Sequence, residues 1–499
     1  MICKVKYALN TFALAMLVVF GTSCEQKNES KKPNIVYVIC DDLGYGDVQF
    51  LNPEHGKIPT PNMDKLATEG MSFTDAHGGS SVCTPTRYGV LTGRYAWRSH
   101  LQTGVLGGGA EFEPLISEDI LTVPKLLKRA GYQTAAMGKW HLGFAVNDAE
   151  GNPVDVYNGK KRPSPAPIGS VVPNGPVSRG FDSYLGFHHS ASMETVIKDD
   201  KVIDNMPTVK MLEFLGDNAS EYIEEKSKEK DPFFLYLALN SPHTPIVPSE
   251  NWKGKSGMGD YCDFVMETDY VVGRVMEALK KNGIEENTLV FLTSDNGCSY
   301  FPAKAGKLQK EYGHYISGPF RGSKSDIWEG GHRVPFIAKW PGKIEAGSTN
   351  EQLVCLTNLM ATVADITNVV VPENEGVDSY SILPLLIDEN AKSAYTSVIH
   401  HSIKGKFSIR KGKWKLELCP GSGGWSFPND GRARKDGDPE IQLYDLENDI
   451  SEQNNVYQQH PELVKELTAE LVAIVERGRT KEGEKLNNDV EVDIFKSDK

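Results

Sequence analysis

Three stretches of β-forming apolar residues, each the length of one strand, constrain this chain more than any other feature. They cover residues 35–40, 233–239 and 289–294. Uninterrupted apolar runs of this length are typical of strands that are buried on both faces of a largely parallel sheet. The sequence therefore predicts an α/β fold in which a large central, mostly parallel mixed sheet is flanked by helices.

Helical patterns lie between these runs. Residues 60–70 combine a threonine cap, a proline at the first helical position and a glycine stop, and residues 122–130 end at Gly131. Residues 260–281 place apolar side chains at helical spacing, which predicts a packing helix. The region 147–180 has no periodicity and is expected to be a long loop.

The pattern changes near residue 385. Short β-rich segments at 397–401, 407–410, 414–418 and 442–446 are separated by turn residues, and an amphipathic helix is predicted over 461–477. We therefore divide the chain into a main domain at 33–385, a smaller C-terminal α+β subdomain at 386–485 and a flexible tail at 486–499. The subdomain should hold an antiparallel sheet and a helix.

Polar side chains follow each of the three apolar runs. Asp41 and Asp42 end the first, His243 follows the second, and Asp295 and Asn296 end the third. Open α/β sheets bind ligands at the carboxyl ends of their strands. The four oxygen-bearing side chains suit Ca²⁺ or Mg²⁺ better than zinc, and the prolines around His243 stiffen a candidate general acid. The alternative for the aspartates is a solvated turn.

The second candidate feature is a predicted helix start, with Cys83 just before it. Thr84 and Pro85 predict an N-cap and a first helical position, so Cys83 should lie just before a helix whose free N–H groups favour an anion. Arg87, about one turn inside, should direct its charge to the same place. The alternative is a buried structural cysteine at an ordinary helix start.

Two further segments carry candidate groups. In an extended segment Lys139 and His141 would project to the same side and face one pocket, although either alone could be an ordinary surface residue. His188 and His189 are either substrate contacts or polar loop residues. Gly107 and the two glycines after it lack the lysine of a phosphate loop, and we expect a loop at the rim of the pocket.

The N-terminus and the composition bound the location and the partners. Residues 1–24 resemble a secretory signal, and Cys24 resembles the lipidated cysteine of a bacterial lipoprotein, with residues 25–32 as a tether. We therefore expect an exported bacterial protein, periplasmic or held at a membrane surface only through that lipid. A net charge of −13 argues against nucleic acid as a partner. The eight cysteines have no zinc-site spacing.

Several of these motifs resemble one known family. Cys-Thr-Pro-Thr-Arg at 83–87 followed by Leu-Thr-Gly-Arg, Asp-Asp-Leu-Gly-Tyr-Gly-Asp at 41–47 and Gly-Lys-Trp-His-Leu-Gly at 138–143 are very similar to motifs of the type I sulfatases. The segment 318–335 is similar to a sulfatase segment with a catalytic lysine, here Lys324. The resemblance covers nearly all of the chain after its signal and implies an alkaline-phosphatase-like fold.

The resemblance also implies a mechanism and its residues. Cys83 would be converted to formylglycine by a maturation enzyme, and Ca²⁺, less readily Mg²⁺, would bind Asp41, Asp42, Asp295, Asn296 and residue 83. Arg87, Lys139 and Lys324 would hold the sulfate, His141 would act as a base, and His243 or Lys324 would protonate the leaving oxygen. Residues 329–335, with Arg333, are expected to be scaffold.

The expected activity is that of an exo-acting carbohydrate sulfatase, with a weak preference for 6-O-sulfated galactose or N-acetylgalactosamine. Two alternatives are a phosphatase or phosphonate hydrolase of the same superfamily, and a lipoprotein that binds sulfated glycans without catalysis. The first lacks a clear zinc-ligand set here, and the second would need a lost catalytic group. The sequence leaves the sugar, the sulfate position, exo or endo action and the oligomeric state open.

Overall fold

A computed structural model describes residues 1, 31–107, 113–156, 164–395 and 397–496. The signal and Cys24, most of the tether, and Gly108 and Gly109 of the expected rim loop lie outside this part of the chain. No helix within the described ranges is long and apolar enough to cross a membrane.

A sheet of ten strands forms the centre of the main domain, in the order β11-β2-β10-β9-β1-β8-β4-β5-β6-β7. The strands are β1 (Asn34–Asp41), β2 (Met71–Phe73), β4 (Gln133–Lys139), β5 (Ser183–Phe187), β6 (Thr195–Lys198), β7 (Lys201–Asn205), β8 (Phe233–Pro242), β9 (Thr288–Ser294), β10 (Phe336–Lys339) and β11 (Ser348–Asn350). From β9 to β5 all neighbours are parallel, whereas β10, β6 and β7 pair antiparallel. The three apolar runs are the neighbouring strands β9, β1 and β8, which are buried strands of a largely parallel sheet as predicted.

Helices cover both faces of this sheet. The core on one face takes side chains from α2 (Cys83–Thr92), α3 (Val123–Arg129), α8 (Leu359–Thr367) and α9 (Leu383–Ile387). The core on the other face takes them from α1 (Pro61–Thr68), α4 (Met211–Lys226), α5 (Asp260–Lys281) and α6 (Ala305–Tyr312). Alternate residues of β1 enter the two cores, because successive side chains of a strand point to opposite faces. The uninterrupted apolar pattern of β1 follows from this double burial.

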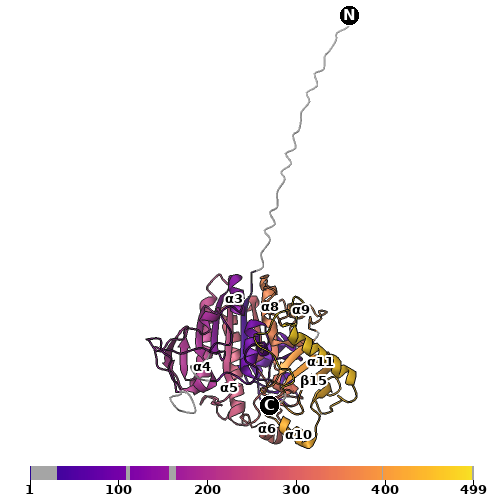
Figure 1. Cartoon of the computed structure of the whole chain (residues 1–499). Helices are drawn as coiled ribbons and strands as arrows, with labels where there is room; N and C mark the ends of the chain where they lie inside the picture. The colour runs from indigo at the N-terminus through magenta and orange to yellow at the C-terminus, as the bar shows by residue number, and fades with distance from the viewer. Residues whose placement is uncertain (2–30, 108–112, 157–163, 396, 497–499) are drawn as a thin grey trace. The chain divides into compact units, whose positions relative to one another are not determined.

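The C-terminal residues form a second, antiparallel sheet in the order β13-β14-β15-β16. Its strands are β13 (Val398–His401), β14 (Phe407–Lys411), β15 (Trp414–Glu417) and β16 (Gln442–Asp445), followed by α11 (Pro461–Glu476); α10 (Asp430–Asp436) precedes β16. Leu467, Leu471 and Ile474 pack α11 onto this sheet, and Figure 1 shows β15 beside the helix. The predicted mixed sheet and smaller antiparallel sheet are both confirmed.

Two local predictions differ from the structure. Helix α2 begins at Cys83 itself with Val82 as its N-cap, and Thr84 accepts a hydrogen bond from the backbone N–H of Leu106 (3.2 Å) instead of capping the helix. Residues 486–496, expected as a tail, pack against the rest of the chain. Ile494 is buried, and the backbone N–H of Asp489 donates to the carbonyl of Arg98 (2.8 Å).

Candidate active site

Two neighbouring carboxylates lie where β1 ends. Asp41 is the last residue of the strand, and Asp42 has a φ of 66°, which turns the chain sharply. The Lys139 ammonium contacts both oxygens of Asp41 at 2.7 and 3.0 Å. The Lys324 ammonium lies 2.6 Å from Oδ1 of Asp42. Each aspartate is therefore buried and paired with a different lysine, one at the end of β4 and one on a distant loop.

The end of β9 adds two oxygen-bearing side chains beside this pair. The backbone N–H of Asp42 donates to Oδ1 of Asp295 (3.2 Å), and Nδ2 of Asn296 donates to Oδ1 of Asp42 (2.7 Å). Oδ1 of Asn296 is buried and has no hydrogen-bond partner in the part of the chain that the structure describes. A buried carbonyl oxygen without a donor is costly unless something else binds it, and a hard cation fits that need.

Cys83 lies at the start of α2, close to the same carboxylates. Its sulfur and one carboxylate oxygen each from Asp41 and Asp295 all lie within 4.8 Å of one another. One turn into the helix, Arg87 donates from Nε to Oδ2 of Asp295 at 2.9 Å and from Nη1 to the carbonyl of Lys139 at 3.1 Å, and its Nη2 lies 2.7 Å from the same Asp295 oxygen as an ion pair. Cys83 and Arg87 therefore both lie beside Asp295, in the first turns of α2.

The pKa values of Asp41 and Asp295 in this buried region are shifted in opposite directions. Burial alone would raise the pKa of Asp41, but His243, Lys139 and Arg87 reverse the effect and hold it well below the usual range. Burial raises the pKa of Asp295 to about 6, and Arg87 offsets only part of that rise. The ionised form of Asp41 therefore depends on the neighbouring cations, which compensate less fully for the burial of Asp295.

The Cys83 thiol is poorly suited to act as a nucleophile in this form. Burial raises its pKa, although Lys139 and Lys324 act in the opposite direction. The thiolate is the reactive form of cysteine, so a raised pKa keeps the side chain inert at neutral pH. The Cys83 sulfur, at the start of α2 and near Lys139 and Lys324, is therefore buried and protonated.

The four candidate histidines occupy different positions. His243 follows β8, and its Nε2 is 3.8 Å from Asp42 Oδ2. His141 has a φ of 56°, which ends the extended segment after Lys139, and its Nε2 bonds to the carbonyl of Leu106 (2.8 Å). Among the described residues, Nδ1 of His141 is buried and has no hydrogen-bond partner, and burial lowers the pKa of the ring well below its usual value. The ring is therefore neutral and has a free lone pair.

His188 and His189 both contact His141. The carbonyl of His188 accepts the backbone N–H of His141 (2.8 Å), and the His188 ring is buried against Phe144, with centroids 4.6 Å apart. The ring of His189 lies 4.5 Å from that of His141 and is partly exposed. Burial, reinforced by Lys139, lowers the pKa to about 3 for His188 and about 2 for His189.

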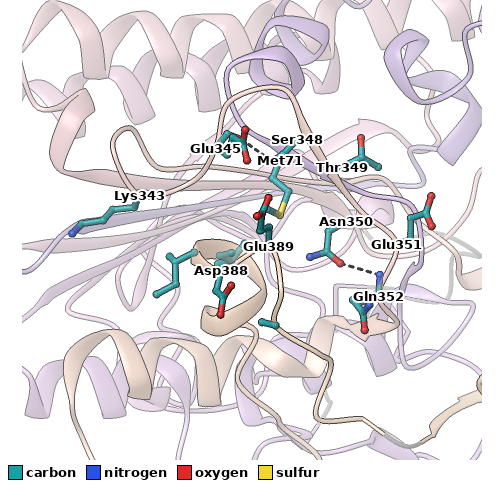
Figure 2. Close-up of a pocket in the computed structure, with 13 residues that line it drawn as sticks. Met71, Lys343, Glu345, Ser348, Thr349, Asn350, Glu351, Gln352, Asp388 and Glu389 are labelled. Carbon is teal, nitrogen blue, oxygen red and sulfur yellow. Dashed lines mark hydrogen bonds between the residues drawn. The ribbon is translucent and has the colours of Figure 1, made fainter.

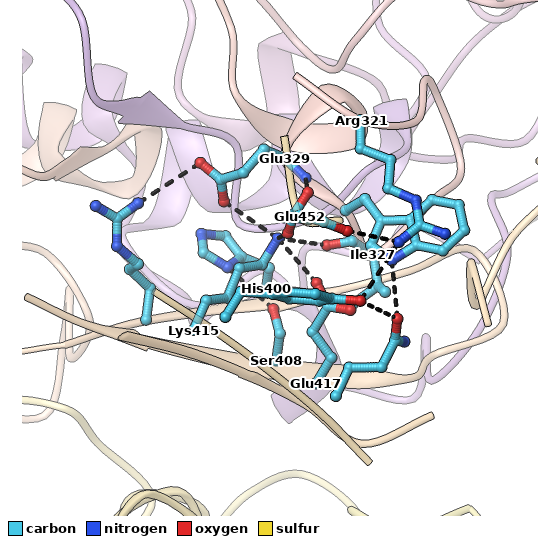
Figure 3. Close-up of polar contacts among 12 residues, drawn as sticks. Arg321, Ile327, Glu329, His400, Ser408, Lys415, Glu417 and Glu452 are labelled. Carbon is cyan, nitrogen blue, oxygen red and sulfur yellow. Dashed lines mark hydrogen bonds and ion pairs between the residues drawn. The ribbon is translucent and has the colours of Figure 1, made fainter. Parts of the chain in front are cut away.

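A second buried polar group, not predicted from the sequence, joins the main domain to the C-terminal sheet (Figure 3). The Lys415 ammonium lies 2.7 Å from Glu452, 3.1 Å from Glu417 and 3.1 Å from Glu329 of the short helix α7 (Glu329–His332). It also donates to the carbonyl of Ile327 (2.9 Å), three residues after Lys324. This cluster fixes the segment that carries the site lysine, which agrees with the scaffold role expected for 329–335.

Histidines from three distant segments also meet beside this cluster. One nitrogen each of His77, His332 and His400 lies within 4.8 Å of the others, and Nε2 of His77 bonds to Asp75 (2.8 Å). The rings of His332 and His400 stack at 3.8 Å. Their spacing in the sequence gives no indication of this grouping, because only the folded chain brings β3 (Ala76–His77), α7 and β13 together.

A surface pocket beside the edge strand β11 lies apart from these groups (Figure 2). Its lining is acidic, with Glu345, Glu351, Asp388 and Glu389. None of the predicted site residues lines it. Because like charges repel, a pocket of this composition would disfavour an anionic substrate.

Comparison with known proteins agrees with this geometry. The sulfatase family model matches residues 33–369. An N-acetylgalactosamine-6-O-sulfatase of Bacteroides thetaiotaomicron is 30% identical over 514 aligned positions, which cover 91% of this chain and 97% of that protein. A solved B. thetaiotaomicron structure, described in connection with the metabolism of multiple glycosaminoglycans, superposes with a TM-score of 0.76 at 27% identity and covers 89% of this chain and 99% of its own.

A second solved structure, Ps i-CgsB in complex with a neocarrahexaose, has a TM-score of 0.70 at 27% identity over 89% of this chain and 92% of that one. The family match spans well over half of the sequence and includes Asp41, Cys83, Lys139 and Lys324. The chain therefore belongs to the sulfatase family of sulfuric ester hydrolases.

Proposed function

We propose that this protein hydrolyses sulfate esters on glycans, with Cys83 converted to formylglycine as the nucleophile. The observation that carries the proposal is the convergence, in one buried site, of residue 83 at a helix start, three carboxylates, and the fixed cations Arg87, Lys139 and Lys324. As a thiol, residue 83 would be inert, because burial raises its pKa. As a hydrated aldehyde it would offer two hydroxyl groups in the same place.

The donor set fits Ca²⁺. Asp41, Asp42, Asp295 and Asn296 supply only oxygen atoms, and the unpartnered Oδ1 of Asn296 is the type of group that a hard cation would satisfy. Bound there, Ca²⁺ would polarise the sulfate oxygens and favour the ionised form of a formylglycine hydroxyl. Mg²⁺ demands a stricter geometry and is the less favoured ion.

The side chains of the site divide the remaining work. Arg87, Lys139 and Lys324 would bind the sulfate oxygens and stabilise the charge that develops during transfer. One formylglycine hydroxyl would attack sulfur while the sugar oxygen departs with a proton from His243 or Lys324. Neutral His141, through its free Nδ1, would then take the proton of the second hydroxyl, so that the aldehyde re-forms and sulfate leaves.

The substrate class that we propose is based on the names of the relatives. The 30%-identical relative is named an N-acetylgalactosamine-6-O-sulfatase, which favours a 6-O-sulfated galactose or N-acetylgalactosamine at a chain end. Of the two adjacent histidines, the partly exposed His189 is better placed than buried His188 to contact a sugar. We also propose export through residues 1–24, with a lipid on Cys24, and a maturation enzyme that acts on Cys83.

The test is sulfate release from a panel of position-defined sulfated sugars, with a phosphate and a phosphonate monoester for comparison. The wild type should release sulfate from at least one sugar and act poorly on the phosphorus esters. Cys83→Ala should lose this activity and keep its melting temperature. Binding of sulfated sugars without turnover, in protein whose residue 83 is modified, would instead support the non-catalytic glycan-binding alternative.

A further inference from the structure

A loop of the C-terminal subdomain carries two exposed aromatic residues and is hydrogen-bonded to the segment that contains Lys324. Trp425 is 50% exposed and Phe427 is 70% exposed. Burying side chains of this size typically contributes about 1.5–3 kcal/mol each, so the fold gains nothing from leaving them in water. Single exposed apolar residues are common, but two on one short loop beside a catalytic segment call for a reason.

The loop is held rigidly from within. The backbone N–H of Ser422 donates to the carbonyl of Pro428 (3.0 Å), and the Ser422 hydroxyl donates to the carbonyl of Ser426 (2.8 Å). The N–H of Gly423 donates to Asp430 (2.9 Å). The two aromatic side chains therefore project from a closed loop with little freedom to lose on binding a ligand.

The loop is also fastened to the active site. The backbone N–H of Trp425 donates to Oγ of Ser325 and to Oδ1 of Asp326, both at 3.0 Å. Ser325 in turn donates its N–H to the carbonyl of Ser81 (2.8 Å), two residues before Cys83. Two hydrogen bonds thus link the Trp425 backbone to the segment of the nucleophile, and Ser325 directly follows Lys324.

The close contact between this loop and the Lys324 segment requires a glycine at position 424. A Cβ atom at Gly424 would lie 2.4 Å from the carbonyl oxygen of Ser325 and 2.5 Å from Oδ1 of Asp326. Only a residue without a side chain lets the loop lie this close to the Lys324 segment. The contact is thus built into the fold, and the backbone of the next residue, Trp425, bonds to the two residues that follow Lys324.

A second exposed aromatic pair lies on a further segment, which is hydrogen-bonded to the Lys324 backbone. The Lys324 N–H donates to the carbonyl of Cys298 (2.9 Å). Shortly after Cys298 come Tyr300, 42% exposed, and Phe301, 71% exposed, with ring centroids 5.4 Å apart. Two of the segments that bond to the backbone around Lys324 therefore present aromatic rings to solvent.

We infer that Trp425 and Phe427 form a subsite for the uncharged sugar ring next to the sulfated residue of a glycan chain. Aromatic faces are apolar and rigid, and the C–H face of a pyranose can stack on them without losing the hydration of its hydroxyl groups. Lys324 is proposed to act at the leaving oxygen, so the loop beside it lies on the side where the rest of the glycan emerges. The inference rests on the proposed glycan sulfatase function and adds where the chain beyond the sulfate ester binds.

The test compares two substrates that share one sulfated residue, a monosaccharide and a trisaccharide, on purified full-length protein. Trp425→Ala should raise the ratio of the trisaccharide KM to the monosaccharide KM by about tenfold, a change of about 1.4 kcal/mol. Phe427→Ala should raise it by a smaller factor, and Trp425→Phe should retain most of the wild-type ratio. Tyr270→Ala, which removes a 46% exposed aromatic side chain on α5, is the matched control and should leave the ratio unchanged.

The outcomes separate this inference from the proposed function. If the wild type hydrolyses both sugars and Trp425→Ala leaves the KM ratio unchanged, or lowers kcat equally on both, the subsite is refuted and the sulfatase function stands. If the wild type hydrolyses neither, the proposed function fails. In that case, the subsite is tested by calorimetric titration of Cys83→Ala and Cys83→Ala/Trp425→Ala with the desulfated trisaccharide. The double variant should bind the trisaccharide more weakly, and equal binding would refute the subsite. A dimer in sedimentation that Trp425→Ala converts to monomer would assign the loop to contact between copies and overturn the inference.

Discussion

Replacing Lys415 with methionine isolates the energetic role of the buried cluster in Figure 3. The substitution keeps a long side chain but removes the ammonium that lies within 3.1 Å of Glu329, Glu417 and Glu452. Removing one partner of a buried ion pair costs about 3–5 kcal/mol, because the opposite charge is left buried and unpaired. Against a typical unfolding free energy of 5–15 kcal/mol, this is a large fraction of the total stability.

The matched control is Lys411→Met on the neighbouring strand β14. The Lys411 side chain is 39% exposed and pairs with Glu466 at 3.0 Å and Glu470 at 2.8 Å. Exposed pairs of this kind contribute about 0–1 kcal/mol. Urea denaturation of both variants and the wild type at pH 7, followed by far-UV circular dichroism, should therefore show a shift of the unfolding midpoint at least three times larger for Lys415→Met.

The pH dependence has a definite sign. Burial raises the pKa of Glu452 and of Glu417 even with Lys415 present. Without the ammonium, the folded-state pKa values of Glu452 and Glu417 should rise further above their unfolded value of about 4.3, whereas Arg333 and Arg410 still pair with Glu329. The folded variant therefore binds more protons than the wild type and loses stability as pH rises. The gap between variant and wild type should be small near pH 4.5 and widen toward pH 7. Equal losses for the two lysine variants, or a gap that narrows as pH rises, would refute the reasoning.

Three further predictions concern the site. Arg87→Met should lower kcat for sulfate release by about 10²-fold or more, because one fixed donor to the transferring group is lost; a change below tenfold would contradict its role. Removal of Ca²⁺ with a chelator should lower the melting temperature of the wild type, and Asn296→Leu should reduce the stabilisation regained when Ca²⁺ is restored; equal recovery would exclude Asn296 as a ligand. His141→Gln should slow the second half of turnover, so that sulfated enzyme accumulates in a rapid-quench experiment; a normal steady-state level would remove His141 as the base.

Much of the main sheet could be predicted because its pattern is local. The runs that became β1, β8 and β9 are apolar throughout, and the residues after them were expected at one edge of the sheet because parallel strands share that edge. Helix α5 matched its predicted bounds, Asp260–Lys281, since a long amphipathic pattern specifies its own ends. The motifs around Asp41, Cys83 and Lys139 then carried the resemblance to the sulfatases.

What could not be predicted depends on contacts between distant segments. Thr84 lost the role of N-cap because its hydroxyl bonds to Leu106, and Ile494 is buried because residues 486–496 pack against distant parts of the chain. The left-handed turn at His141 broke the extended geometry that would have aimed it beside Lys139. The Lys415 cluster draws its carboxylates from three separate segments, and no local pattern relates them.

The chemical state of residue 83 in active protein tests the central claim most directly. Peptide mass analysis of protein that releases sulfate should show residue 83 with its sulfur replaced by oxygen and two hydrogens fewer, and the intact protein should react with a hydrazide probe. The modified fraction should rise in proportion to specific activity across preparations that differ in maturation. A preparation that releases sulfate at the full rate while residue 83 is entirely an unmodified thiol would contradict the account.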